Sequence, residues 1–136
     1  MSPTRAVVGA LGAVYVIVGI LGFLGDPIVT QGSHADMPSA SGDLMGLFPI
    51  NAIHNVVHLL IGGILLYGAT DLDRAIPIAR GVAITYAIVG VLGLFAPDTF
   101  GLMPIGGNDV WLHLGTAIVL YGVTFLENRD AVARTA

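Results

Sequence analysis

Four long apolar segments separated by polar connections dominate the pattern along the chain. Each is free of Asp, Glu, Lys and Arg for 17 residues or more. That is the length an α-helix needs to cross a hydrocarbon core about 30 Å thick. The sequence therefore predicts one domain over residues 1–136, an all-α integral membrane four-helix bundle. The predicted helices occupy about residues 6–25, 49–69, 77–96 and 109–126.

The two halves of the chain share a pattern that predicts an internal repeat. "YVIVGILGFL" from Tyr15 and "YAIVGVLGLF" from Tyr86 agree at six of ten positions, and each half later reaches a Tyr-Gly pair, in "ILLYG" from Ile64 and "IVLYG" from Ile118. Because two spans separate equivalent helices, the halves would be parallel two-helix repeats.

Glycine indicates how the helices pack. The chain has 19 glycines, and small residues let membrane helices approach closely. Gly9, Gly12 and Gly19 are spaced to share one groove on the first helix. We expect the same packing role for Gly62, Gly81, Gly90, Gly93 and Gly115 on the other helices.

Composition supports a membrane protein and excludes several chemistries. Charged residues make up 10% of the chain, against about 25% in soluble domains. The chain has no cysteine for disulfides or thiolate metal sites, and no lysine for a phosphate-binding loop. With no basic patch, we expect no nucleic-acid partner.

The distribution of charge predicts the orientation. All basic residues fall in the N-terminal segment, the connection between the second and third helices, or the C-terminal tail: Arg5, Arg74, Arg80, Arg129 and Arg134. The other two connections carry acidic residues but no Arg or Lys. By the positive-inside rule, both termini are cytoplasmic, and the expected location is the cytoplasmic membrane.

Four polar residues interrupt the second apolar segment, in "NAIHNVVHLL". Asn51, His54, Asn55 and His58 follow spacings of three, four and seven, which place them on one helical stripe. Polar groups inside a membrane rarely face lipid, so we expect this stripe to point into the bundle. His113 lies about one turn inside the fourth helix, at a similar depth. His34, in the irregular outer loop, is expected to be solvated.

The polar residues leave several interpretations open. His54 and His58, four residues apart, could chelate a metal ion, and His113 could join them. Alternatively, a histidine on each helix could hold a haem from opposite sides. The same residues could instead form interhelical hydrogen bonds with Tyr15 or Tyr86, or line a pocket for a small ligand. No nucleophile, base and acid appear together, which does not favour an enzyme.

The signature "NAIHNVVHLLIGG", with "YVIVGILGF" before it and "WLHLGTAIVLYG" in the last helix, resembles domain-of-unknown-function family 4383. The resemblance covers nearly the whole chain. It implies a small four-helix membrane protein and no particular activity. It also implies that the residues matching its motif matter together: Asn51, His54, Asn55, His58 and His113.

The favoured interpretation from sequence is a non-enzymatic structural or accessory component of the membrane. Its partners would be the lipid bilayer and either further copies of itself or a larger membrane complex. The first alternative is a metal- or haem-binding redox or sensory module that uses His54, His58 and His113. The second is a carrier or channel for a small ligand.

Overall fold

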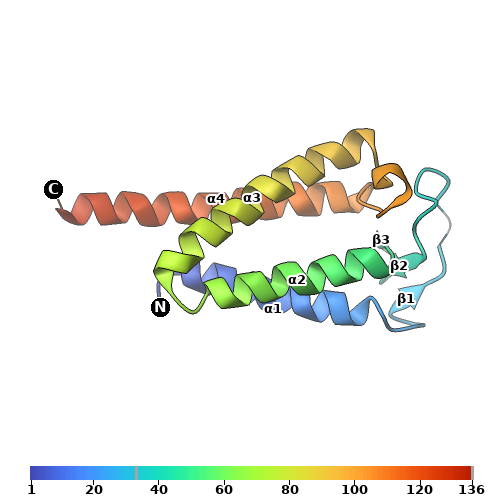
Figure 1. The fold of residues 1–136 in the computed structure, drawn as a ribbon, viewed down its shortest axis with the longest axis horizontal. Helices are drawn as coiled ribbons and strands as arrows, with labels where there is room; N and C mark the ends of the chain where they lie inside the picture. Colours follow the sequence, from blue (N-terminus) through green and yellow to red (C-terminus); the bar gives the residue numbers. More distant parts are fainter. Residues whose placement is uncertain (33, 136) are drawn as a thin grey trace.

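The computed structural model describes residues 1–32 and 34–135, with side chains described up to residue 127. Four helices lie side by side, and three short strands gather at the end of the bundle opposite the N-terminus (Figure 1). In chain order the elements are α1 Pro3–Leu21, β1 Val29–Thr30, β2 Gly42–Leu44, β3 Phe48–Ile50, α2 Ala52–Gly68, α3 Leu72–Phe95, the 3-10 helix η1 Thr99–Gly101, and α4 Asn108–Thr135.

The predicted all-α four-helix fold is confirmed, but several helix ends differ. α1 begins at Pro3 because the Ser2 side chain accepts a hydrogen bond from the Arg5 N–H and caps the helix. α3 begins at Leu72, capped by Asp71, so Pro77 lies inside the helix and not at its start. α4 continues to Thr135, beyond the predicted end at residue 126.

The start of α2 is also corrected, from about residue 49 to Ala52. Asn51 takes an extended backbone conformation, and its side chain accepts a hydrogen bond from the His54 N–H. The resulting helix has 17 residues, or about 25 Å at ~1.5 Å per residue. α2 is therefore a shorter apolar helix than α1, α3 and the described part of α4, which are the three long enough to cross a membrane.

The sequence predicted an irregular connection between α1 and α2, but part of it forms strands. β1, β2 and β3 form an antiparallel sheet in that order. The β2–β3 turn uses Met45 and Gly46 at positive φ, a conformation that glycine adopts without steric cost. Leu44 and Ile50 are buried, so the small sheet covers one end of the bundle.

Helices α1 and α2 pack as one pair, and α3 and α4 as another. A Cβ atom added at Gly62 would lie 2.7 Å from the Val16 backbone N, and one at Gly12 would lie 2.8 Å from the Leu66 N. Glycine therefore permits this close crossing, as predicted. The prediction was wrong for Gly81 and Gly115, which face open space.

Large apolar side chains lie on the outside of the bundle and polar ones lie inside. Ile118 is 73% exposed and Ile88 62%, whereas the histidines of α2 and α4 are buried. This inverts the usual arrangement of a soluble protein and suits a lipid environment. Helices α1, α3 and the part of α4 up to Glu127 are long and apolar enough to span a membrane.

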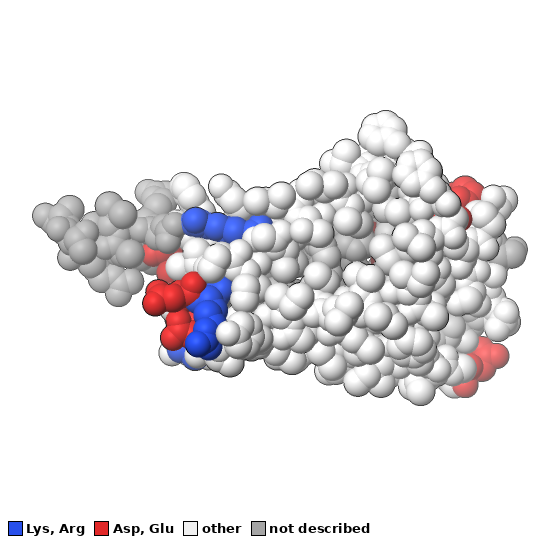
Figure 2. Space-filling view, in the orientation of Figure 1, with Lys and Arg blue, Asp and Glu red and all other residues white. Residues whose placement is uncertain are grey.

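Charged side chains gather at the two ends, and the face in Figure 2 is uncharged between them. Arg5 donates to the carbonyl oxygens of Ala69 and Thr70 at 2.9 and 3.0 Å, which ties the start of α1 to the end of α2. Arg74 donates to the Thr70 hydroxyl at 3.1 Å, and Arg80 donates to the Thr124 hydroxyl on α4 at 3.3 Å. The basic side chains in Figure 2 gather at this end. The side chains of Arg129 and Arg134 lie outside the described part of the chain.

Candidate functional site: a buried histidine cluster

Three histidines from two helices meet inside the bundle, near the end covered by the strands. His54 and His58 lie one turn apart on α2, and His113 lies in the second turn of α4. Their exposed fractions are 2%, 6% and 4%. The structure thus brings together the three residues that the sequence offered as metal ligands.

The ring nitrogens of the cluster are close enough to bind one common ligand. The Nε2 atoms of His54 and His58 lie 3.0 Å apart. One ligand atom from each of the three histidines lies within 4.8 Å of the others. The rings of His54 and His113 are stacked, with centroids 6.4 Å apart and planes 20° apart.

Two tyrosines contact the histidine rings. Tyr15 meets His58 edge to face at 5.1 Å, and Tyr86 meets His113 in the same way at 4.9 Å. The Tyr15 hydroxyl is 3.1 Å from Thr116 Oγ1. The tyrosines therefore pack against the rings, and no described hydrogen bond joins them to the histidines.

Asp109 is a buried member of the site that sequence reasoning placed only near its rim. It is 1% exposed, and its Oδ2 atom lies 3.8 Å from His54 Nδ1. The available signal was its spacing, since a residue four positions before His113 shares its helical face. His54 thus has Asp109 beside Nδ1 and His58 beside Nε2.

Several polar atoms of this cluster are buried without a hydrogen-bond partner among the described residues. They are His54 Nδ1, Asp109 Oδ2, His113 Nδ1 and the Tyr86 hydroxyl. Each such atom costs roughly 1–3 kcal/mol, and native proteins seldom leave them without a reason. All four atoms lie at or beside the three histidines.

The asparagines of the predicted stripe have structural contacts. Asn51 caps α2, and its Nδ2 donates to the carbonyl oxygens of Ser39 and Leu102. Asn55 Nδ2 donates to the Gly22 carbonyl at 2.7 Å and so joins α2 to the end of α1. Both asparagines stabilise the strand-covered end of the bundle, near the histidines.

His34 lies apart from the cluster. Its Nε2 atom is 2.7 Å from Asp43 Oδ1, on strand β2. Its side chain is 28% exposed, so His34 is partly open to solvent, as expected, and it also contacts a carboxylate.

A small cavity of about 60 Å³ adjoins the histidines under the strands. His54, His58 and Asp109 are among the residues that line it, together with the apolar Leu44, Phe48 and Ile50. We refer to it below as the chamber.

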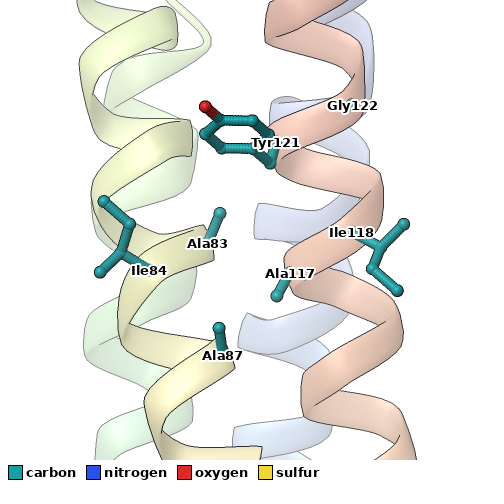
Figure 3. Close-up of a pocket in the computed structure, with 7 residues that line it drawn as sticks. All are labelled: Ala83, Ile84, Ala87, Ala117, Ile118, Tyr121 and Gly122. Carbon is teal, nitrogen blue, oxygen red and sulfur yellow. The ribbon is translucent and has the colours of Figure 1, made fainter.

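A larger hollow of about 400 Å³ lies between α3 and α4, away from the histidines. Figure 3 shows Ala83, Ala87 and Ala117 pointing into the space between the two helices, with Tyr121 at one end. Small side chains make this hollow, and its walls offer almost no polar atoms. It suits hydrocarbon contact.

The fold and the inward-facing polar cluster define a class, namely a small integral membrane four-helix bundle. A family described as a domain of unknown function, DUF4383, matches residues 5–126 of the chain. The protein belongs to this family, as its sequence signature suggested. No curated protein and no solved structure gives a significant match.

Proposed function

We propose that this membrane protein binds a transition-metal ion on His54, His58 and His113. The observation that carries the proposal is the convergence of three buried imidazoles, with one ligand atom of each within 4.8 Å of the others. Imidazole nitrogen is a common ligand for zinc, copper, iron and nickel. The bound ion would form the centre of an accessory or sensory module in the membrane.

The spacing of the nitrogens supports a shared ion. Two nitrogens bound to one ion at roughly 2.1 Å lie about 3.0 Å apart at a right angle and about 3.4 Å apart at the tetrahedral angle. The separation of 3.0 Å between the Nε2 atoms of His54 and His58 falls at the lower of these values. Small rotations of the rings would bring His113 to the same ion.

The neighbouring groups also favour an ion over a purely structural network. Histidine ligands usually direct their second ring nitrogen toward a carboxylate or a carbonyl group. His54 turns Nε2 toward His58 and Nδ1 toward Asp109.

A metal ion fits this site better than a haem does. The chamber beside the histidines measures about 60 Å³, whereas pockets for molecules of cofactor size measure roughly 300–1,000 Å³.

The test is metal binding by protein purified in detergent without a histidine tag. Elemental analysis gives the native metal, and titration of chelator-treated protein with Co²⁺ gives stoichiometry and affinity from the visible bands of the ion. We expect one Co²⁺ per chain, and at least a tenfold loss of affinity in His58→Ala and His113→Ala.

His34→Ala is the matched control, because it removes a histidine outside the cluster and should bind Co²⁺ like the unaltered protein. If neither a native metal nor Co²⁺ binds, or if His34→Ala and His58→Ala lose binding equally, the proposal is wrong. The alternative of an accessory protein stabilised by polar packing alone would then be favoured.

A further inference from the structure

Arg80 bridges α3 and α4 near the end of the bundle that carries the N-terminus. Its Nε atom donates to the Thr124 hydroxyl on α4 at 3.3 Å. Among the described residues, neither Nη atom of Arg80 makes a hydrogen bond, and Arg80 has no ion pair. A guanidinium group is always charged and carries five N–H donors. Arg80 therefore keeps donors and a positive charge for an external anion.

The acidic side chains near this end have other partners. Glu127, three residues beyond Thr124, accepts a hydrogen bond from the Thr4 N–H on α1 at 2.9 Å. Asp71 accepts one from the Asp73 N–H at 2.8 Å. Within the described part of the chain, no carboxylate therefore neutralises Arg80.

The apolar hollow between α3 and α4 begins one turn from Arg80. Ala83 and Ile84 line it three and four residues after Arg80, and Tyr121 lines it three residues before Thr124. Residues at these spacings share a helical face. Figure 3 shows the Tyr121 ring reaching from α4 toward α3 at the end of the hollow, with its hydroxyl oxygen on the side of α3. A cation and a phenol hydroxyl thus lie at the same end of the hollow.

The apolar surface continues along α3 beyond this hollow. A second hollow, of about 470 Å³, shares one residue with the first and is lined by Ala87, Ile88, Val91, Leu92 and Phe95. Between Ala83 and Phe95 the helix rises about 18 Å at ~1.5 Å per residue. One leaflet of a hydrocarbon core about 30 Å thick measures about 15 Å. The two hollows therefore match the length of one lipid acyl chain.

A charged end joined to a long apolar groove has the chemistry of one class of membrane molecule. An uncharged lipid would fill the groove but leave Arg80 without a partner, and a free phosphate ion would leave the groove unused. Basic sites between membrane helices on the cytoplasmic side bind anionic head groups, and the positive-inside rule predicts that this end is cytoplasmic. An anionic phospholipid fits both parts.

We propose that α3 and α4 form a binding site for an anionic phospholipid. Arg80 and the Tyr121 hydroxyl donate to its phosphate, and one acyl chain lies in the two hollows along α3. This site lies apart from the histidine cluster and does not depend on a metal ion.

The experiment titrates the full chain, in an uncharged detergent, with phosphatidylglycerol and counts bound lipid by native mass spectrometry. Phosphatidylcholine with the same acyl chains is the zwitterionic probe, and inorganic phosphate is the anion without chains. We expect one phosphatidylglycerol per chain, at concentrations at which phosphatidylcholine does not bind. Inorganic phosphate in about tenfold excess should not displace it.

Arg80→Gln tests the charged end. It should raise the phosphatidylglycerol concentration required about fivefold, as expected for the loss of one arginine beside an anionic head group. Arg74→Gln is the matched control, because Arg74 contacts the Tyr67 ring and the Thr70 hydroxyl and does not line the hollow. It should bind like the unaltered protein.

Gly122→Leu tests the apolar part. Gly122 lines the first hollow, and nothing lies within 4 Å of an added Cβ, so the leucine occupies the space of the acyl chain. We expect at least a fivefold loss of phosphatidylglycerol affinity. Gly63→Leu, on α2, is the matched control, because its added Cβ also meets open space and it lines neither hollow. Ala87→Leu gives a second test should Gly122→Leu not fold.

Each part of the proposal can fail separately. Equal binding of phosphatidylglycerol and phosphatidylcholine, or equal losses in Arg80→Gln and Arg74→Gln, overturns the head-group site. Displacement of the lipid by inorganic phosphate, or equal affinities of Gly63→Leu and the variants that fill the hollow, overturns the acyl-chain site.

Discussion

The Nε2 atoms of His54 and His58 face each other at 3.0 Å inside the bundle, with both rings buried. Two unprotonated nitrogens at this distance would repel each other, so a proton or an ion must lie between them. The pair is held from both sides, by the edge of the Tyr15 ring against His58 and by Asp109 behind His54. It is therefore a fixed element of the bundle.

If an ion occupies this position, it should stabilise the fold. A ligand that binds only the native state at about 100 times its Kd adds about 2.7 kcal/mol to the free energy of unfolding. We expect Zn²⁺ to raise the melting temperature of chelator-treated protein, as followed by circular dichroism in detergent. Mg²⁺, which prefers oxygen ligands, should have no effect, and a Zn²⁺ effect that persists in His113→Ala would argue for binding elsewhere.

The crossing of α1 and α2 depends on Gly62. Its added Cβ would lie 2.7 Å from the Val16 N and 2.9 Å from the Gly12 carbonyl oxygen, and backbone atoms cannot move aside easily. We expect Gly62→Ala to lower the free energy of unfolding by about 1–3 kcal/mol. Gly63→Ala is the control, because nothing lies within 4 Å of the added atom. Denaturation in detergent compares the two, and equal stability of both variants would refute the tight crossing.

Asn51 joins the start of α2 to the two connections that contain Ser39 and Leu102. Asn51→Ala loses the helix cap, at a cost of about 0.5–2 kcal/mol, together with the bonds to Ser39 and Leu102. Asn51→Asp keeps an acceptor for the His54 N–H but loses both donors. Hydrogen exchange at the His54 amide should therefore accelerate in the alanine variant and stay slow in the aspartate variant. Equal acceleration in both would mean that the cap is not the important contact.

Much of the histidine site could be predicted because helical spacing is a strong signal. His54 and His58 share a face by their separation of four residues, and the distance of His113 from the end of its apolar segment gave a similar depth. The helical face of the asparagines was also evident. Their separate roles depend on the loops and on the neighbouring helix, which a single helical pattern does not describe.

The outer sheet and the position of Asp109 could not be predicted in the same way. Strands β1, β2 and β3 have two or three residues each, which is too short for an alternating pattern to appear. They form because Leu44 and Ile50 can cover the end of the bundle. From the sequence, Asp109 lay at the start of its helix and was expected at the rim of the site. The sequence does not show that the strands cover this end of the bundle and bury it.

The orientation of the chain is a further prediction. Arg5 and Arg74 contact the connection between α2 and α3, the basic side chains in Figure 2 gather at one end of the bundle, and the positive-inside rule predicts that this end is cytoplasmic. The chain has no cysteine, so a single introduced thiol reports its own location. In intact cells, a membrane-impermeant maleimide should label Asp36→Cys but not Asp73→Cys, and permeabilised cells should show both. The reverse pattern would invert the topology.

Asp109 should tune the metal site through His54. Its carboxylate lies 3.8 Å from His54 Nδ1 and has an oxygen with no hydrogen-bond partner among the described residues. Replacing such partners of ligand histidines typically weakens metal affinity by about 10–100-fold. We expect Asp109→Asn to weaken Co²⁺ binding within this range and to shift the visible bands of the bound ion, and Asp109→Glu to restore part of the affinity.

Asp98→Asn is the matched control for this prediction. Asp98 is also buried, but its carboxylate accepts hydrogen bonds from Ser39 and not from the histidine cluster. This variant should lose stability without changing the Co²⁺ bands. If Asp109→Asn instead lowers the melting temperature like Asp98→Asn and leaves Co²⁺ affinity unchanged, Asp109 supports only the packing of α4. Because affinity, band position and melting temperature are measured on the same samples, a positioning role and a purely structural one give different results.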